Sequence, residues 1–321
     1  MENSTLIVTL IGITIFISLL LAVFLLTVKT ENSLSNRLFA CFILLTAIDS
    51  GGFLLNAFAE GPSNLAMFRS LLIFCQLPVF YLYVLSETYT DFRLQLKHLT
   101  HILPLLVANL ILIPRFYAVD TAAKLSFLQN IKSMFEIQFN HAFLHIQIAF
   151  YLILIFTLIK RSKKLYLENY AGASLASFNW LFQFTMALSI FFGVALLKNI
   201  FKFSAFSSIS EWLKIGLYVL EIIIISWYLF KALSHPELFR KIDSKLRLVK
   251  DLVNEATPRS ANNADIIKLK EYMNAKKPFL NPSLTIQNIS SEIGIPVREL
   301  SLLINHTLGQ HFFDFVNTYR I

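Results

Sequence analysis

Long apolar runs separated by short polar segments dominate most of the chain. A transmembrane helix needs roughly 20 mostly apolar residues to cross about 30 Å of hydrocarbon, and seven runs approach that length. Periodicity inside the runs is weak, as expected for helices that are apolar on all sides. We therefore predict about seven membrane-spanning helices, the fourth of them short, at 6–28, 38–58, 66–86, 99–113, 141–159, 175–197 and 211–233.

The composition supports an all-α membrane protein. Hydrophobic residues make up 56% of the 321 residues and charged residues only 15%, whereas soluble domains carry about 25% charged residues. No Lys or Arg precedes the first run and no small-residue cleavage site follows it, so we interpret it as a helix and not as a signal peptide. Cys41 and Cys75 both fall inside apolar runs, which favours core packing over a disulfide.

The net charge of +8 is unevenly distributed between the loops. Lys and Arg are more frequent in the loops after the first, third and fifth runs and after the seventh run than in the loops between them. Because basic residues gather in cytoplasmic loops, this bias predicts an N-terminus outside and a C-terminus in the cytoplasm. The expected location is the inner membrane of a bacterium.

The composition changes after residue 234, and we divide the chain into a transmembrane sensory domain at 1–234, a helical linker at 235–263 and a tail domain at 264–321. Residues 237–256 have the apolar stripe of an amphipathic helix. That helix suits three roles: relaying movement of the last span, pairing with a second copy in a homodimer, or packing on the tail. Residues 257–263 form a polar break and a plausible hinge.

The tail carries the spacing of a helix-turn-helix. A helix is expected at 264–277, ended by Pro278. Thr285 fits the N-cap of a second helix, which Gly294 closes with the left-handed backbone that glycine tolerates. Pro296 fits the start of a third helix, at 297–308, and Gly309 its end. Small Ser290, four residues before the turn glycine, suits the close crossing of two helices.

The segments 277–285, 293–294, 298–305 and 308–320 resemble the AraC/XylS family of transcription regulators, in the branch that joins this domain to a multi-span membrane region. The resemblance implies that Arg298, Ser301 and Asn305 lie on the recognition helix and contact promoter DNA. Two departures bear on that expectation. Leu302 stands where the family usually carries Arg, and the sequence stops at Ile321, within the helix that joins the family's two helix-turn-helix motifs.

The charge of the tail is almost balanced. Residues 262–321 carry six Lys or Arg and five Asp or Glu, and six minus five gives +1. Since affinity for DNA depends heavily on neutralising phosphates, we expect this half of a DNA-binding unit to bind DNA weakly by itself.

Ionisable residues inside the apolar runs are costly and therefore candidates for function. Asp49 and Glu221 are the predicted ligand-sensing residues, with polar contacts between helices as the alternative interpretation. His141 and His145 lie four residues apart at the outer end of the fifth run. Without an evident third ligand, we interpret them as interfacial residues and not as a metal site.

The sequence favours two functions. We expect neither to be enzymatic, because no catalytic motif, cofactor site or metal motif is evident. The first is a membrane-bound, DNA-binding transcription regulator that senses a small-molecule or lipid signal through its spans. The second is a membrane receptor or interaction protein whose incomplete tail no longer binds DNA. A transporter is a third, weaker hypothesis, because no internal repeat or pair of broken helices is visible.

Overall fold

The computed structural model describes residues 2–28, 33–52, 54, 61–171, 176–204, 206–234, 263–281 and 284–320. The described residues are helical and form no strand beyond one isolated bridge between Tyr170 and Thr285. The chain divides into two compact units. The first comprises 1–87, 92–156 and 180–237, and the second comprises 88–91, 157–179 and 238–321.

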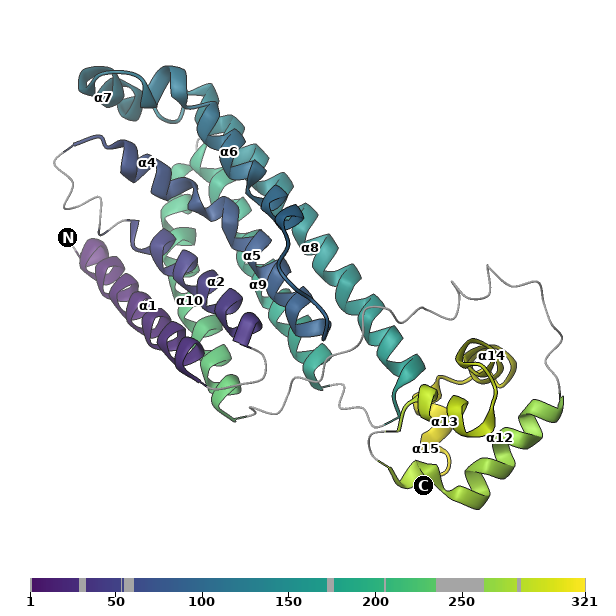
Figure 1. Cartoon of the computed structure of the whole chain (residues 1–321). Coiled ribbons are helices and arrows are strands. Elements are labelled where there is room, and N and C mark those ends of the chain that lie inside the picture. Colours follow the sequence, from purple (N-terminus) through teal and green to yellow (C-terminus); the bar gives the residue numbers. More distant parts are fainter. Residues whose placement is uncertain are drawn as a thin grey trace. The chain divides into compact units, whose positions relative to one another are not determined.

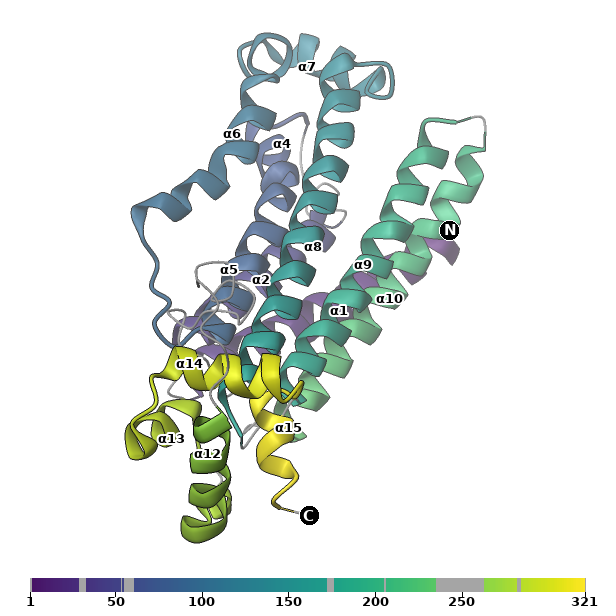
Figure 2. The ribbon, with the colours of Figure 1, turned by 90° about the vertical axis from the view of Figure 1, so that its right-hand side faces the viewer.

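Long helices that run side by side form the first unit (Figures 1 and 2). The helix α1 packs against α2 and α10. The last turns of α8 and the first residues of α9 belong to the second unit. The α-helices that lie wholly or partly in this unit include α1 (Glu2–Thr27), α2 (Ser33–Ser50), α4 (Asn64–Leu71), α5 (Gln76–Thr88), α6 (Leu103–Leu110), α8 (Phe135–Asn169), α9 (Ala176–Lys202) and α10 (Ser207–Ser234).

Five helical stretches among the described residues are long and apolar enough to cross a membrane, namely Thr5–Thr27, Asn64–Thr88, Phe135–Asn169, Ser177–Lys202 and Ser208–Lys231. The chain is therefore a multi-pass membrane protein. Each of these stretches coincides with one of the predicted runs. The second predicted run begins in α2, but 53 and 55–60 lie outside the described residues.

Aromatic rings hold the helices of the first unit together around Phe39 of α2. The ring of Phe39 stacks on Tyr228 of α10 with centroids 4.0 Å apart, and it lies 4.7 Å from Tyr83 of α5 and 5.6 Å from Phe184 of α9. All four side chains are buried. Because helices in lipid gain little from the hydrophobic effect, such dense van der Waals contact supplies much of their association energy.

A proline removes one backbone hydrogen bond from the third predicted span, and a side chain of another helix supplies a substitute. Pro78 has no N–H, so the carbonyl of Phe74 lacks its usual helical donor. Just before Pro78 the helix is a tighter 3₁₀ helix, η1 (Leu72–Cys75). Gln147 of α8 donates its Nε2 to the Phe74 oxygen at 2.9 Å. This bond replaces the missing one where no water is present.

The fourth predicted span, 99–113, is not a continuous α-helix. A 3₁₀ segment, η2 (Leu96–Ile102), leads into the short α6, and a π-helical turn, η3 (Ile113–Tyr117), follows. Prolines stand at the start of both later elements and explain the breaks. Asn140 of α8 donates its Nδ2 to the buried carbonyl of Ala108 at 3.0 Å.

Two further differences concern the loops on either side of α6 and α8. A short helix, α7 (Thr121–Gln129), lies where only a loop was expected, and Asp120 caps it by accepting from the Ala123 amide at 2.8 Å. The helix α8 has 35 residues, about 50 Å, and extends beyond the predicted 141–159 at both ends. Glu136, in its first turn, pairs with Arg115 at 3.6 Å.

The second unit contains the tail, built from α12 (Asn263–Lys276), η4 (Pro278–Leu280), α13 (Ile286–Ile293), α14 (Val297–Leu302), η5 (Leu303–Thr307) and α15 (Phe312–Asn317). The predicted amphipathic helix at 237–256 and the hinge at 257–263 lie outside the described residues, apart from residue 263. One apolar core joins these helices, and Ala171 from the segment between α8 and α9 is part of it: Ala171, Leu269, Met273, Leu284, Ile286, Ile289, Ile293, Ile295, Leu300, Leu303, Ile304, Phe312, Phe315 and Val316.

We predict that the Gln147 bond and Pro78 are coupled. Gln147→Met should lower the free energy of unfolding by about 1–3 kcal/mol, because the Phe74 carbonyl loses its donor. In a Pro78→Ala background the residue-78 amide can supply that donor, so Gln147→Met should cost less. Thermal unfolding of the four proteins in one detergent measures both effects. Equal costs in the two backgrounds would contradict the coupling.

Candidate functional site

A buried hydrogen bond joins α10 to α2 in the first unit. The Oγ of Ser50 lies 2.6 Å from Oε1 and 2.8 Å from Oε2 of Glu221, and both side chains are buried. A serine hydroxyl has one proton, so it can donate to only one carboxylate oxygen at a time. An acid at membrane depth is stable only with a polar partner, and Ser50 supplies it.

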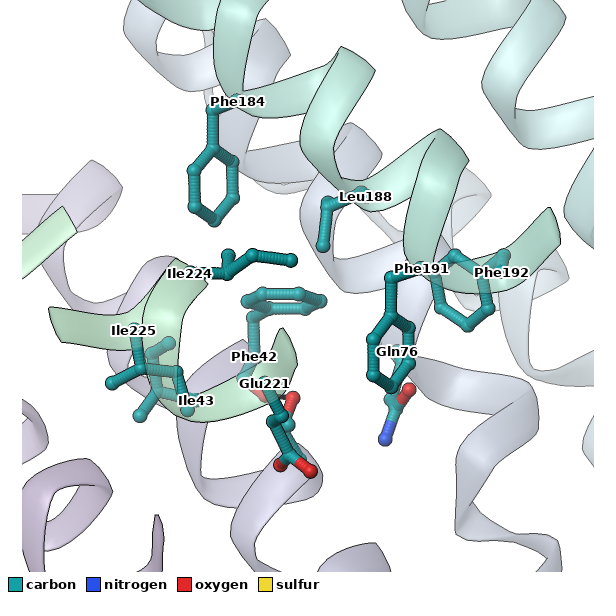
Figure 3. Close-up of a pocket in the computed structure, with 11 residues that line it drawn as sticks. Phe42, Ile43, Gln76, Phe184, Leu188, Phe191, Phe192, Glu221, Ile224 and Ile225 are labelled. Atoms are coloured by element: carbon teal, nitrogen blue, oxygen red, sulfur yellow. Dashed lines mark hydrogen bonds between the residues drawn. The ribbon is translucent and has the colours of Figure 1, made fainter. Parts of the chain in front are cut away.

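Glu221 lines a pocket between α2, α5, α9 and α10, which we call the Glu221 pocket. The space between these side chains is about 400 Å³, part of it open to the surroundings, and the cavity proper, counted by the centres of water-sized spheres, is about 30 Å³. Figure 3 shows the Glu221 carboxylate and the Gln76 amide on one side of the pocket and Phe184 and Leu188 on the other. The remaining lining residues are Phe42, Ile43, Thr46, Phe191, Phe192, Ile224 and Ile225.

This lining sets the kind of ligand that the pocket can accept. Its walls are aromatic and branched aliphatic side chains, and its few polar groups are gathered on one side. Ligand sites commonly combine an apolar wall with a small number of placed polar groups that orient the ligand. The Glu221 pocket therefore suits an apolar molecule or an apolar segment of one.

Asp49, the other acid predicted to sense a ligand, does not line the Glu221 pocket. Its side chain is exposed, and Lys198 and Arg69 are the cations whose charges act on it. Arg69 donates its Nη1 to the Ile48 carbonyl at 3.1 Å, close to the end of α2, where carbonyl groups lack helical donors. Gly52 leaves room for this guanidinium, because a Cβ there would collide with Arg69.

Sequence reasoning thus found Glu221 but missed its partner. Ser50 follows Asp49 directly in the sequence and is itself followed by two glycines. A polar small residue next to an intramembrane acid was the available signal. Of the two predicted acids, Glu221 lines the pocket and Asp49 does not, although the charge of Asp49 acts on Glu221 as well as on Lys198.

The paired histidines of α8 contact α9. The Nε2 of His145 lies 2.9 Å from Nδ2 of Asn199, and the Nε2 of His141 lies 3.5 Å from Nζ of Lys202. Within the described ranges, no three His, Cys, Asp or Glu side chains gather as metal ligands would. The two histidines therefore join a lysine-containing cluster between helices.

The helix α13 begins and ends where the sequence predicts, whereas the helix expected at 297–308 is α-helical only to Leu302 and continues as the π-helical turn η5. The Oγ1 of Thr285 accepts from the Asn288 amide at 3.3 Å, and Asn288 Oδ1 accepts in return from the Thr285 amide at 2.9 Å. This reciprocal capping begins α13. Gly294 ends it with φ 65°. Ser290 then donates its Oγ to the Ile295 carbonyl at 2.6 Å, which fixes the turn to α14.

The three predicted DNA-contacting residues have different surroundings. Arg298 is exposed in the first turn of α14. Ser301 is only 4% exposed, so its hydroxyl is turned away from partners outside the tail. Asn305 is half-buried, donates to the Ser301 carbonyl at 2.9 Å and has Oδ1 3.3 Å from Nδ1 of His311. Of the three side chains, Arg298 is the most accessible to a nucleic acid.

Arg320 links three backbone segments within the second unit. Its guanidinium donates to the carbonyl oxygens of Phe279 at 2.7 Å, Asn281 at 3.0 Å and Ala171 at 2.7 Å. The Ala171 amide also donates to the Leu284 carbonyl at 3.0 Å. We call these contacts the Arg320 clamp. They attach the segment that follows α8 to the tail.

Packing partly shields the Arg320 clamp, in which Arg320 is half-buried and Asn281 is exposed. Ala171 is 0% exposed, and Tyr319 stacks on Phe279 with centroids 5.9 Å apart. Burial raises the pKa of the Tyr319 phenol, so this ring is uncharged beside Arg320 at neutral pH. Hydrogen bonds to a charged donor in such a setting are stronger than neutral ones. Sequence reasoning missed the clamp, since nothing local pairs Ala171 with Arg320, 149 residues away.

Comparison with known proteins adds no family to this description: no family model, curated protein or solved structure matches the chain.

We predict that Ser50→Ala destabilises the first unit by about 1–3 kcal/mol, because Glu221 is left buried without its hydroxyl partner. Ser18→Ala is the matched control. Ser18 is a fully buried serine of α1 whose Oγ has no hydrogen-bond partner among the described residues, so its loss should cost little. Thermal unfolding in one detergent compares them. Equal effects of the two changes would contradict a specific Ser50–Glu221 bond.

We also predict that Arg320→Ala loosens the Ala171 attachment. Hydrogen exchange at the Ala171 amide should accelerate by about tenfold or more, because loss of one charge-assisted bond costs about 1.5–3 kcal/mol. Lys276→Ala, which removes an exposed charge of α12, is the control and should leave this amide unchanged. Mass spectrometry of exchanged full-length protein gives the rates. Unaltered protection at Ala171 in Arg320→Ala would show that the guanidinium does not hold this segment.

Proposed function

We propose that this protein is a membrane-bound transcription regulator that senses a signal through its membrane helices and acts on DNA through its tail. The observation that carries the proposal is the tail geometry: a capped α13, a left-handed Gly294 and an α14 that presents Arg298 at its exposed start. An exposed arginine at the start of a second helix is where helix-turn-helix proteins contact bases.

The proposal includes the finer topology expected from the sequence. Seven spans would place the N-terminus outside and the tail in the cytoplasm of a bacterial inner membrane, where it can reach DNA. The tail would act as an AraC/XylS-type helix-turn-helix. The Glu221 pocket would receive the signal, a small molecule or lipid, because it combines an apolar lining with a fixed acid.

A regulator of this kind needs a physical connection between membrane helices and tail. The Arg320 clamp supports one, since Ala171 follows directly on α8, a helix that begins among the membrane spans. A shift at the end of α8 would act on the carbonyl and amide of Ala171 that the tail holds. Such a route is independent of residues 237–256, the linker first expected to transmit the signal.

The second candidate function is a membrane receptor or interaction protein whose tail binds a protein partner instead of DNA. Burial of Ser301 and the internal bonding of Asn305 favour this alternative. The tail's charge of +1, counted from the sequence, also favours it. A DNA-binding surface normally supplies several cations to phosphates.

The test is binding of the full-length protein, in nanodiscs, to a library of DNA fragments from upstream regions of its own genome. We predict that specific fragments are retained and that Arg298→Ala weakens their binding by about 1–3 kcal/mol, or reduces the salt slope by about one if Arg298 contacts phosphate.

Lys268→Ala provides the control for net charge, because Lys268 is an exposed cation on α12 outside the helix-turn-helix. It should leave sequence preference unchanged. Retention of no fragment by the wild-type protein would move the assignment to the receptor alternative. Equal losses in Arg298→Ala and Lys268→Ala would contradict base contact by Arg298.

A further inference from the structure

A group of basic and polar side chains lies between α8 and α9, on the part of α9 that follows the Glu221 pocket. Two interhelical contacts define it, His145 to Asn199 at 2.9 Å and His141 to Lys202 at 3.5 Å. Each of its members is buried or half-buried. We call it the lysine–histidine cluster; its members are His141, His145, Lys198, Asn199 and Lys202.

Positive charge is concentrated at this cluster. Lys202 lies close enough to Lys198, Lys132 and Lys214 for their charges to repel it. The nearby acids are Asp49, which attracts Lys198, and Glu211, which pairs with Lys214 at 3.7 Å. Half-buried cations that outnumber the acids around them are stabilised by an anion from outside the chain.

Asn199 adds a polar atom without a partner. It is 8% exposed, and its Oδ1 makes no hydrogen bond within the described part of the chain. The oxygen and nitrogen of an asparagine amide are interchangeable in position. With the amide turned over, the oxygen accepts from His145 and the NH₂ group remains to donate to a ligand. The cluster then offers an amide donor beside two ammonium groups.

The lysine–histidine cluster and the Glu221 pocket share the helix α9. Lys198 follows Phe192 of the pocket by six residues on α9, which is about 9 Å along a helix. Lys214 precedes Glu221 by seven residues on α10, which is about 10 Å. The cluster therefore follows the pocket within two turns along α9, and Lys214, whose charge acts on the cluster, lies within two turns of Glu221 on α10.

We propose that this protein binds an acidic amphiphile, with its carboxylate or phosphate head at the lysine–histidine cluster and its apolar chain in the Glu221 pocket. The inference builds on the sensing role in the proposed function and names the chemistry of the signal. An acidic head is attracted by Lys198 and Lys202, whereas the apolar lining of the Glu221 pocket suits the chain, so the two ends of the molecule have different preferred places.

Two tryptophans next to the pocket allow binding to be measured directly. The rings of Trp180 and Trp227 lie 5.8 Å and 6.4 Å from that of Phe184, which lines the pocket. Trp212, the third tryptophan, is 68% exposed and is removed by Trp212→Phe. The probes are a brominated long-chain carboxylic acid, the alkyl phosphate and the alcohol of the same chain, because bromine quenches nearby tryptophan.

The experiment uses the full-length protein in nanodiscs of zwitterionic lipid. The acid and the alkyl phosphate should quench with saturation, and Lys198→Gln with Lys202→Gln should raise the half-saturating concentration by about tenfold or more, since each lost charge-assisted bond costs about 1.5–3 kcal/mol. The paired Arg variants, which keep both charges, should bind nearly as the wild type does. Lys231→Gln, at the other end of α10, should have no effect.

Competition identifies the source of the amphiphile. If nanodiscs with anionic lipid block the acid, the site holds a lipid of the bilayer; if they do not, it takes a free molecule. Equal binding of the alcohol, or unchanged binding in the paired Gln variant, would overturn the proposal. Because this measurement contains no DNA, saturable binding without any retained DNA fragment would overturn the regulator and leave the ligand inference intact.

Discussion

The absence of water in hydrocarbon is the constraint on which the first unit depends. A backbone N–H or C=O without a partner there costs several kcal/mol, so each break in a helix needs a substitute donor or acceptor. Gln147 and Asn140, both on α8, donate to carbonyl groups left free by breaks in the neighbouring elements. Arg69 does the same near the end of α2. The helix α8 therefore spans the bundle and also supplies hydrogen-bond donors to the interrupted elements beside it.

The same absence of water makes the acid in the Glu221 pocket costly. An acid at this depth weakens the bundle unless it is bonded, and one serine supplies the bond. A well-packed apolar residue would serve stability as well or better. The presence of Glu221 is therefore better explained by the polarity it gives to one side of the pocket, whose other walls are aromatic and aliphatic. The buried acid lies where four helices, α2, α5, α9 and α10, surround the pocket.

Features that depend on a few neighbouring residues were predictable from the sequence. Apolar runs located the five helical stretches now seen, and Thr285 and Gly294 located both ends of α13, because capping and a left-handed turn are decided locally. The prediction of one continuous helix at 99–113 was wrong. Pro104 and Pro114 lack the backbone N–H that a continuous helix needs, and the hydrophobicity of the run does not report this. The Ser50–Glu221 bond and the Arg320 clamp join residues far apart in sequence, and no local pattern encodes which distant carbonyl a guanidinium will meet.

The burial of Ala171 has a consequence for how the tail matures during synthesis. Its core contains a residue made long before the rest, and that residue follows a helix that inserts into the membrane. The tail thus completes its fold onto a segment that is already anchored. A fragment cut out after α10 would lack this piece of its own core, and one acceptor of Arg320, and would behave as a weaker, looser module than the tail of the intact chain. Solubility of such a fragment is a poor guide to how firmly the native tail is built.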